Sequence, residues 1–508
     1  MNLTSALSIA TGGIANINTQ LALISQNVAN AGTAGYATEV STQSSIVGDG
    51  VGFGVRTGVA QRQIDQALTD SLTVQNATVS NLATTQTALQ AIDSVLGTVG
   101  DGNDLGSLVG ALQDSFSTLL TDPGSQAAQS AVVSAAGTLA GDINTLSASL
   151  TQQRTTAQQT LQSEVDTLNQ TLGTIGQLSD KIMAATAVGH ATADLENQRD
   201  AAVQTLSSLV GVKTIQQANG DLLVYTSSGT QLPIHGTSAP FSIAGGSTQP
   251  ASYYPGGGLS GILLNGQDVT AGMTGGEIGA NLALRDQTIP TAQAELDEFS
   301  VNLTSRFAAQ GLTLFTDGSG SVPTLGGPPV QAGYVGYAAS IQVNPAVQAQ
   351  PSLVRDGTDT IAGSATGASA FTPNPATGPS GFSTLISRVL SYALGSDAQA
   401  GVPQPGFNTT GLGPGGTLTA QFSGAATLAS YASGITSTLS AQSNTVTSQL
   451  STEQSVQTAL QNQVASVSGV NVDTEMSKMI TLQNAYSANA RVITVAQSMF
   501  NTILQATE

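Results

Sequence analysis

The sequence predicts a mainly α-helical protein with a β-rich insert. Helices at the two chain ends are expected to pair as a coiled coil, next to a shaft that is a bundle of long helices and a distal β-rich domain. Two observations predict this architecture. All 17 prolines lie between Pro123 and Pro414, so both ends lack the residue that most often interrupts helices. In these proline-free ends, apolar residues recur at helical spacing.

The N-terminal helix is predicted from a heptad pattern that continues for almost four heptads. Its apolar residues alternate by four and three positions: Leu3, Leu7, Ala10, Ile14, Ile17, Leu21, Ile24 and Val28. A second stripe near the C-terminus, interrupted only by Asn489, consists of Met479, Leu482, Tyr486, Asn489, Ile493, Ala496, Phe500 and Ile503. Neither helix has a partner nearby in sequence, so we expect the two to pair. Packing of both stripes on the shaft of the same subunit is the alternative.

Further helices are predicted between the terminal ones. Leucine and valine residues at helical spacing indicate helices in 61–96 and 428–460. The longest candidate covers 126–186, and a periodic pattern of this length is typical of a coiled coil or an extended bundle. Another helix is expected in 277–310.

The middle of the chain has a different pattern. Residues 213–272 contain short runs with Asn-Gly and Ser-Gly turns, which predict a β-hairpin region. Residues 313–420 are rich in Gly, Pro, Ser and Thr, which indicates a β-rich distal insert with long loops. The Gly-rich run 48–55 is interpreted as a flexible turn after the first helix. Residues 1–60 are predicted to form one half of the coiled coil and a linker, and residues 467–508 the other half. Residues 61–312 are predicted to form the shaft with its β-hairpin region, residues 313–420 the distal insert, and residues 421–466 a returning shaft helix.

The composition excludes several classes of partner. Only 8% of the 508 residues are charged, where about 25% is usual, so polar uncharged side chains must cover the surface. The formal net charge is -19, with 12 lysines and arginines in total. A basic face for a nucleic acid cannot be assembled from so few cations. Binding to an anionic membrane surface is disfavoured for the same reason.

The sequence contains no cysteine, so it has neither a disulfide framework nor a thiolate metal site. Residues 1–30 lack the positive segment and the continuous apolar core of a secretory signal. No run approaches the roughly 18 apolar residues of a membrane span. We therefore expect neither a cleaved signal peptide nor a membrane-spanning segment.

Both chain ends resemble one family. The segment ALSIATGGIANINTQLALISQNVANAGTAGY is similar to the N-terminus of the axial proteins of the bacterial flagellum, in which a helix ends in N-x-A-N-x-x-T-x-G-[YF]. The matching residues are Asn27, Ala29, Asn30, Thr33, Gly35 and Tyr36. The closing segment of the family matches at Val472, Glu475, Met476, Gln483, Tyr486, Ala488, Asn489 and Ala490. Ala34 stands where the family commonly has proline.

The interior is similar to the hook-associated members of this family. DLENQRDAAVQTLSSLVGV (194–212) and GGEIGANLALRDQTIPTAQAELDEF (275–299) resemble their shaft segments. IQVNPAVQAQPSLVRDGT (341–358) resembles part of their distal domain. The resemblance covers most of the chain from residue 3 to 504 and is weakest at 100–190 and 360–425.

The resemblance implies a structural role outside the cell. Hook-associated members form the junction layer between hook and filament, with the hook protein below and a second junction protein above. Subunits pass through the flagellar type III export apparatus without a cleaved signal peptide, and a cytoplasmic export chaperone holds the C-terminal segment beforehand. We therefore expect an extracellular flagellar subunit that polymerises through its paired terminal helices.

The predicted assembly interface combines the two stripes with the end of the first helix. Asn27 and Asn30 are expected to cap or turn this helix, with contact between subunits as the alternative. Tyr36 is interpreted as a packing aromatic of the turn, and Tyr486 as a core residue of the coiled coil. The candidate residues are Leu3, Leu7, Ile14, Ile17, Leu21, Ile24, Val28, Asn27, Asn30, Gly35, Tyr36, Met479, Leu482, Tyr486, Asn489, Ile493, Phe500 and Ile503.

Two Arg-Asp pairs are predicted to be structural residues of the shaft: Arg199-Asp200 and Arg285-Asp286. Neighbouring residues on a helix point in different directions, so each member is expected to pair with another helix. The two histidines, His190 and His235, are interpreted as solvated loop residues because neither has ligand spacing.

We predict no enzyme, no metal site and no cofactor, because no nucleophile–base arrangement or carboxylate cluster with ligand spacing is present. Three alternatives to the hook–filament junction remain open. The first is a hook or distal rod protein of the same family, the second is a Gly/Thr-rich surface adhesin, and the third is an enzyme within 313–420.

Overall fold

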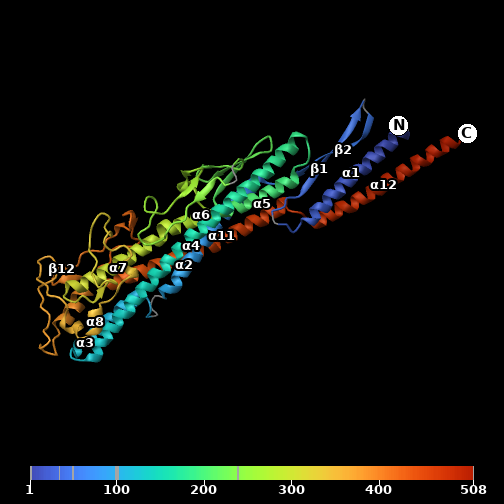
Figure 1. Ribbon diagram of the computed structural model, residues 1–508. Helices are drawn as coiled ribbons and strands as arrows, with labels where there is room; N and C mark the ends of the chain where they lie inside the picture. Colours follow the sequence, from blue (N-terminus) through green and yellow to red (C-terminus); the bar gives the residue numbers. More distant parts are fainter. Residues whose placement is uncertain (1–2, 34, 49–50, 98–101, 237–238, 507–508) are drawn as a thin grey trace.

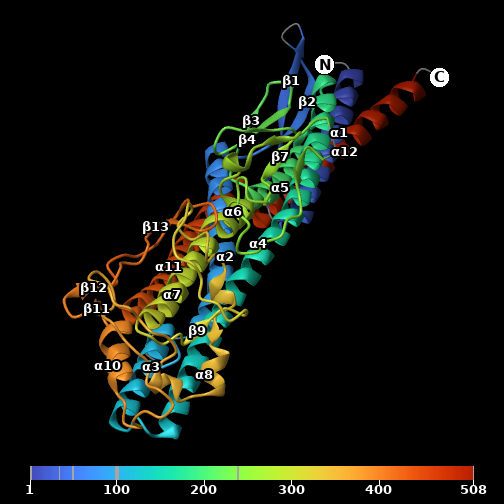
Figure 2. The ribbon, with the colours of Figure 1, turned by 60° about the vertical axis from the view of Figure 1, so that its left-hand side comes forward.

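The protein is an elongated rod with both chain ends at the same tip (Figure 1). The computed structural model describes residues 3–33, 35–48, 51–97, 102–236 and 239–506. Its longer helices are α1 (Leu3–Ala29), α2 (Gln66–Leu96), α3 (Leu105–Thr121), α4 (Gln126–Ala187), α5 (Ala193–Leu209), α6 (Gly276–Ala283), α7 (Ile289–Ala309), α11 (Leu428–Ser468) and α12 (Val472–Gln505). The rotated view shows the same arrangement, with α1 and α12 at one tip and α3, α8 and α10 at the other (Figure 2).

Capping residues define where the long helices begin. The side chains of Asp65, Asp104 and Ser125 accept hydrogen bonds from backbone N–H groups in the first turns of α2, α3 and α4. Thr427 opens α11 with a capping box, and Asn471 caps α12. Caps of this kind pair the backbone donors that have no partner within the helix. Without proline in its interior, α4 continues for 62 residues.

The prediction of a mainly α-helical fold with a β-containing insert is confirmed. Two small antiparallel sheets cover the middle of the shaft, in the strand orders β3-β4-β5 and β6-β7-β8. Their strands are β3 (Val212–Gln216), β4 (Leu222–Thr226), β5 (Gln231–Leu232), β6 (Phe241–Ile243), β7 (Ile262–Leu264) and β8 (Gln267–Asp268). All of them lie in the region where the sequence predicts strands.

The distal insert contains short elements joined by long loops. Its strands form three two-stranded ribbons. They are β9 (Phe315–Thr316) with β10 (Gln342–Val343), β11 (Asp397–Gln399) with β12 (Val402–Pro403), and β13 (Thr410–Leu412) with β14 (Leu418–Thr419). The short helices are η3 (Tyr337–Ala339), α8 (Pro345–Ala349), α9 (Leu353–Asp356), α10 (Thr384–Arg388) and the π-helical η4 (Val389–Ala393). Most of the insert is therefore held by packing and side-chain hydrogen bonds, since its ladders are only two or three residues long.

The segment after α1 is a β-hairpin, which corrects the expectation of a linker with a flexible turn. Strand β1 (Glu39–Gly48) pairs antiparallel with β2 (Val51–Arg62), from Glu39 opposite Arg62 to Gly48 opposite Val51. The turn residues 49–50 lie outside the described residues. The sequence carries little signal for these strands, because polar residues fall on both faces of β1 and hide the alternation of a half-buried strand.

Two hydrophobic cores lie one behind the other along the shaft. The distal core includes Leu139, Phe299 and Tyr431, from α4, α7 and α11. The proximal core includes Leu168 and Val224, from α4 and β4. Helix α4 contributes to both cores, so it is the element that joins them.

A buried polar layer separates the two cores. The fully buried Arg285 donates to Gln158 Oε1 at 2.7 Å and to the Ser260 carbonyl at 3.1 Å. Arg154 donates to the backbone carbonyls of Arg285, Gln249 and Ser252. Buried guanidinium groups need such partners, because an unpaired charge in the interior is strongly unfavourable.

The structure corrects the expectation that Arg285 and Asp286 point apart. The guanidinium of Arg285 donates to both carboxylate oxygens of Asp286, each at 2.7 Å. The two residues lie in a π-helical turn, η2 (Leu284–Thr288). Arg355 and Asp356 in the α-helix α9 form the same kind of pair, with both distances 2.8 Å, so a long arginine side chain can fold back onto its helical neighbour in either kind of turn.

Two glycines of α4 are expected to respond in opposite ways to substitution by alanine. A Cβ atom at Gly176 would collide with the carbonyl oxygen of Ile234, whereas a Cβ at Gly173 meets no atom within 4 Å. We expect Gly176→Ala to lower the free energy of unfolding by about 1–3 kcal/mol through overpacking. Gly173→Ala, the matched control one turn away, should raise it by about 0.5–1 kcal/mol. Urea unfolding measures both, and equal stabilisation by the two variants would contradict the described crossing of the chain over Gly176.

Candidate assembly interface

Helices α1 and α12 form a pair at the tip that holds both chain ends (Figure 1). The main contacts of α1 are with α12 and with the β1–β2 hairpin. The hairpin is fastened to α1 by a hydrogen bond from the Thr57 hydroxyl to Asn16 Oδ1. The two apolar stripes lie at opposite ends of the sequence, and they therefore meet each other in space beyond the end of the shaft.

The predicted stripe residues occupy the seam of this pair, but α12 is only partly covered. On α1, Ile17 and Ile24 are buried, and the remaining candidate apolar residues are half-buried: Leu3, Leu7, Ile14, Leu21 and Val28. On α12, Met479, Leu482, Asn489 and Ile493 are half-buried. Tyr486, Phe500 and Ile503 are exposed, at 40%, 39% and 57%. Tyr486, interpreted from the sequence as a core residue, is thus at the edge of the seam, because a two-helix pair has no second layer to enclose it.

Asn489, which interrupts the apolar stripe, lies against a glycine of the facing helix. A Cβ atom at Gly13 would lie 3.2–3.3 Å from the side-chain amide of Asn489, so only glycine leaves ordinary room for it. The Asn489 Nδ2 group donates to the Ala485 carbonyl at 3.1 Å. A polar residue in a helical seam costs stability but favours one alignment of the two helices. The Gly13–Asn489 contact therefore favours one register of α1 against α12.

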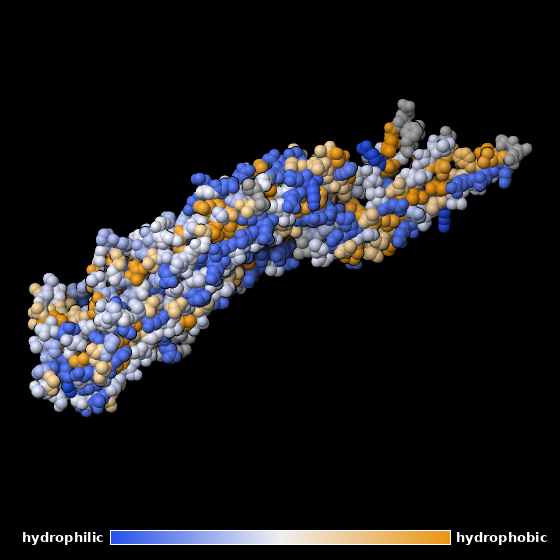
Figure 3. All heavy atoms as spheres, viewed as in Figure 1, coloured by the Kyte–Doolittle hydropathy of each residue, from blue (hydrophilic) through white to orange (hydrophobic). Residues whose placement is uncertain are grey.

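A second set of apolar side chains on α12 faces outward. Met476, Ile480, Val492, Val495 and Met499 are between 43% and 57% exposed. Figure 3 shows apolar residues along the surface of this terminal tip. Apolar residues gathered on one exposed helix mark an interaction surface more often than single exposed ones do. We call these five residues the outer apolar face.

A polar joint connects the terminal pair to the shaft, and Asn27 is its centre. Asn27 is 1% exposed. Its Nδ2 group donates to the Glu39 carbonyl at 2.9 Å and to Glu475 Oε2 at 3.2 Å. Its Oδ1 atom accepts from the Tyr36 hydroxyl at 3.1 Å and from the Glu39 N–H at 3.0 Å. One amide side chain thus links α1, the following turn, β1 and α12.

The joint is continued by contacts with the shaft helices. The Thr38 N–H donates to the Ser468 carbonyl, at the end of α11, at 2.7 Å. Asn197 on α5 accepts from the Ala37 N–H at 3.3 Å and donates to the Ala37 carbonyl at 3.2 Å. Segments from both ends of the chain therefore meet α5 and α11 at one place.

The predicted shaft residues Arg199 and Asp200 pair with different elements. Asp200 and Glu196, one turn apart on α5, both accept from Arg62 at the end of β2. Arg199 is 1% exposed and donates to the Gly220 carbonyl at 2.8 Å and, at 3.4 Å, to the Ser179 hydroxyl on α4. The two neighbours point apart, as expected for an α-helix. Asp200 therefore fastens the hairpin to α5, and Arg199 fastens α5 to α4.

Burial changes the acid–base behaviour of the joint. It raises the pKa of Glu39, with Asp194 adding repulsion and the Arg62 guanidinium opposing the shift. Burial likewise raises the pKa of Tyr36, to which the negative charge of Glu39 also contributes. The phenol of Tyr36 therefore keeps the proton that it donates to Asn27.

The turn between Asn27 and Tyr36 is closed by local hydrogen bonds. Asn30 Nδ2 donates to the Gln26 carbonyl at 3.1 Å, so this residue helps to end α1. Gly35 has a φ of +78°, a left-handed conformation that a side chain would disfavour. Ala34, which replaces the family's proline, lies outside the described residues.

The joint also contains residues that the candidate set omits: Glu39, Arg62, Asn197 and Glu475. Glu475 is 2% exposed and accepts from Lys478 Nζ at 2.6 Å as well as from Asn27. The pairing of Arg62 could have been suspected from the sequence. Cations are rare in this chain, and Glu196 and Asp200 are spaced four residues apart, which places both carboxylates on one side of a helix. Asn197 carries no such signal, because many asparagines occur on the helices.

The described residues contain no group of three or more His, Cys, Asp or Glu side chains that could hold a metal ion. His235 lies between two carboxylates, 3.0 Å from Asp221 and 3.3 Å from Asp180, and is 40% exposed at its side chain. His190 is exposed. Within the described part of the chain, no helix is long and apolar enough to cross a membrane.

Two family models match the sequence. The family described as "Flagellar hook-associated protein FlgK helical domain" matches residues 89–320, from the end of α2 to just beyond α7. The family described as "Flagellar basal body rod FlgEFG protein C-terminal" matches residues 461–506, which comprise the end of α11 and α12.

Curated relatives align over nearly the whole chain. The flagellar hook-associated protein 1 of Escherichia coli is 24% identical over 551 residues, which cover 99% of this chain and 100% of that protein. The protein of the same name from Salmonella typhimurium is 25% identical over 574 residues, with the same coverage. The one from Bacillus subtilis is 26% identical over 222 residues, or 41% of this chain and 44% of that protein.

A solved structure of the flagellar hook junction protein FlgK from Burkholderia pseudomallei is 27% identical to the part of this chain that it matches. The match covers 50% of this chain and 45% of that chain, with a TM-score of 0.40. The two family matches and the near full-length alignments support one assignment. This chain is similar to flagellar hook-associated protein 1 over nearly its whole length.

Proposed function

We propose that this chain is a non-enzymatic subunit of the junction layer between the flagellar hook and filament, and that it polymerises through the paired helices α1 and α12. The observation that supports this most is the outer apolar face of α12, which remains exposed although α12 is already paired with α1. A helix that keeps apolar side chains on its free side gains by packing against a further surface.

The terminal pair is suited to fold fully only on assembly. Two helices in isolation bury little apolar surface, and short sets of helices are marginal in water. Packing of the outer apolar face against neighbouring subunits would bury five more side chains, each contributing about 1.5–3 kcal/mol as an upper limit. Contacts of different surfaces on successive subunits extend a helical layer rather than closing a dimer.

The β1–β2 hairpin offers a second contact in this proposal. Ile46, Val47, Val55 and Val59 are between 40% and 60% exposed, on a two-stranded ribbon whose outer edges are unpaired. Exposed strand edges with apolar side chains readily pair or pack with another chain. We infer that residues 1–60 and 467–508 form one assembly unit, and that residues 61–466 form the shaft and distal insert.

We further propose the partners and route that go with this role. The hook protein would lie below the layer and a second junction protein above it. An export chaperone would cover the C-terminal segment beforehand, in keeping with the apolar side chains that α12 exposes in the single chain. Export through the flagellar type III apparatus, without a cleaved signal peptide, would bring the subunit outside the cell. A hook or distal rod protein of the same axial family is the second candidate, because the family match at residues 461–506 is to rod proteins.

The location of the subunit tests this proposal. In electron micrographs of purified flagella, a label on the full-length chain should mark only the hook–filament boundary. Labelling along the whole hook would favour the second candidate. A variant that lacks residues 1–30 should keep a folded shaft in solution, because both hydrophobic cores lie outside this segment, yet it should form no junctions in cells. Junctions built by this variant would rule out assembly through the terminal pair.

Asn27→Ala is expected to loosen the joint, because it leaves Glu475 and Tyr36 buried without their amide partner. We expect a loss of about 2–4 kcal/mol in local stability. The measurement is hydrogen exchange at residues 36–40 and 470–480 of the full-length chain. Asn30→Ala is the matched control, since Asn30 closes only the local helix end, and it should cost about 1 kcal/mol or less. Equal effects of the two variants would show that Asn27 is not the centre of the joint.

Val495→Asp is expected to block assembly without changing the stability of the single subunit. Val495 is 53% exposed, so a carboxylate there stays solvated and the free energy of unfolding should change by no more than about 0.5 kcal/mol. On assembly, the same carboxylate would have to be buried. Thr494→Asp adds the same charge at a neighbouring exposed polar position and is the control. Counting junctions with attached filaments in cells compares the two, and normal assembly with Val495→Asp would argue against the outer apolar face as a contact.

A further inference from the structure

Three acidic residues of α7 lie within one helical turn and are almost completely buried. They are Glu295, Asp297 and Glu298, with exposed fractions of 0%, 2% and 1%. None of them forms an ion pair with a described arginine, lysine or histidine within 4.0 Å. Burying a carboxylate without a cation is unfavourable unless hydrogen bonds replace its water. The donors that meet these carboxylates come mainly from the distal insert.

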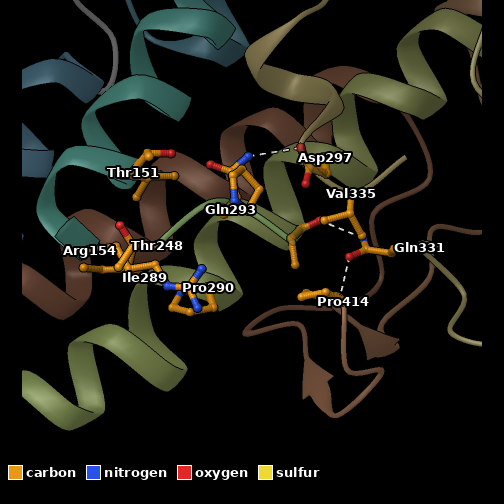
Figure 4. Close-up of a pocket in the computed structure, with 14 residues that line it drawn as sticks. Thr151, Arg154, Thr248, Ile289, Pro290, Gln293, Asp297, Gln331, Val335 and Pro414 are labelled. Carbon is orange, nitrogen blue, oxygen red and sulfur yellow. Dashed lines mark hydrogen bonds between the residues drawn. The ribbon is translucent and has the colours of Figure 1, made fainter. Parts of the chain in front are cut away.

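Asp297 holds the segment around η3. Its Oδ2 atom accepts from the Gly336 N–H at 2.7 Å, and its Oδ1 atom from the Ala338 N–H at 2.9 Å. Gln293 on α7 also donates to Oδ1, at 3.0 Å. Figure 4 shows Gln293 and Asp297 side by side at a small cavity of about 20 Å³. The cavity has room for about one water molecule beside Asp297.

Glu298 holds a second segment of the insert. Its Oε1 atom accepts from the Asn408 N–H at 2.8 Å, and its Oε2 atom from the Tyr334 hydroxyl at 2.7 Å. Asn408 Nδ2 donates to the same carboxylate at 3.1 Å. This residue therefore has donors on both oxygens and is the best satisfied of the three.

Glu295 holds a third segment and is the least satisfied. Its Oε1 atom accepts from the Gln421 N–H at 2.5 Å. Its Oε2 atom is buried and has no hydrogen-bond partner among the described protein atoms. An ionised carboxylate with one oxygen in this position pays a large desolvation penalty, whereas the protonated form does not.

The other ionisable groups around these carboxylates do not offset the penalty. Tyr431 on α11 and Tyr334 next to η3 face them as neutral phenols, and burial raises the pKa of both. Arg154 on α4 lines the cavity beside Asp297 but donates to backbone carbonyls. Arg306 on α7 likewise donates to the carbonyls of Ala426 and Pro405.

We propose that Glu295 and Asp297 on α7 act as a proton-sensitive latch that holds the distal insert against the shaft more firmly at acidic than at alkaline pH. Asp297 and Glu298 fasten the insert at residues 336–338 and 408, and Glu295 fastens residue 421, where the chain leaves the insert toward α11. Residues 408 and 421 flank the β13–β14 ribbon, so one turn of α7 holds this ribbon as well as the segment around η3.

The direction of the pH dependence follows from proton binding. Burial raises the pKa of Glu295 from 4.5 to about 7, against a lowering by the Gln421 hydrogen bond. Burial also raises the pKa of Asp297 from 3.8 to about 7, against three hydrogen bonds that lower it. The seated insert therefore binds more protons than the released one between about pH 4 and pH 7. Its extra stability is present at low pH and is lost as the pH rises through 7.

Hydrogen exchange of the full-length chain at pH 5.5 and pH 8.0 tests the latch. Exchange rates are divided by the intrinsic rate at each pH to give protection factors for peptides that contain residues 336–338, 408 and 421. We expect protection of the 336–338 and 421 peptides to fall at least about tenfold at the higher pH. The measurement must be local, because burial also raises the pKa of Glu164 and Asp142 elsewhere in the rod. These two groups would make the overall stability depend on pH even without the latch. Protection that is unchanged, or higher at pH 8.0, would overturn the proposal.

Two variants and one control assign the effect. Glu295→Gln keeps the acceptor for the Gln421 N–H but cannot ionise, so it should remove most of the fall at the 421 peptide. Asp297→Asn should likewise remove most of the fall in protection at the 336–338 peptide. If Glu295→Gln does not fold, the result with Asp297→Asn alone tests the latch. Asp166→Asn, at an exposed position of α4, should behave as the unmodified chain. A full pH-dependent fall in both latch variants, or a flattening by Asp166→Asn, would contradict the latch.

Discussion

The hydrogen bond between Asn27 and Glu475 joins residues 448 positions apart, and the position of the terminal pair relative to the shaft depends on it. It is buried and charge-assisted, and it lies where α1, β1 and α12 meet the shaft. The same amide also orients Tyr36 and the backbone of Glu39. Both ends of the chain therefore leave the shaft at a defined angle, although the terminal pair beyond the joint is only partly covered.

The long helices could be predicted from sequence because their periodicity extends over many turns and no proline interrupts them. The hairpin after α1 could not, since its strands carry polar residues on both faces. The joint was found only in part. Asn27, Tyr36 and Glu475 stand in recognisable motifs at the two chain ends, but no local pattern shows that Asn27 bonds Glu475 or that Asn197 on α5 bonds the backbone of Ala37. The direct pairing of Arg285 with Asp286 was not predicted, because helical geometry directs neighbouring side chains differently and only the bending of the long arginine side chain brings the two groups together.

Polar groups recur wherever one part of this rod meets the next. Arg285 and Arg154 lie between the two hydrophobic cores, the carboxylates of α7 lie between shaft and insert, and Asn27 lies between shaft and terminal pair. Hydrogen bonds are directional, so they define orientation more narrowly than apolar contacts of the same area. Within each part, by contrast, the contacts are mainly apolar. A chain with so few charges thus places many of them at boundaries, where geometry matters most.

The nested order of the elements also determines when each part can form. The chain begins with α1, but the partner of α1 is the last helix to be made, and the contacts of α2 with α11 likewise wait for residues beyond 428. Contacts between α3 and α4 or α4 and α5 need only short loops and can form early. The early contacts therefore form along α4, from the distal tip to α5, and the tip that carries both chain ends is finished last. Until then, α1 lacks its helical partner and can pack only against the β1–β2 hairpin that follows it in the chain.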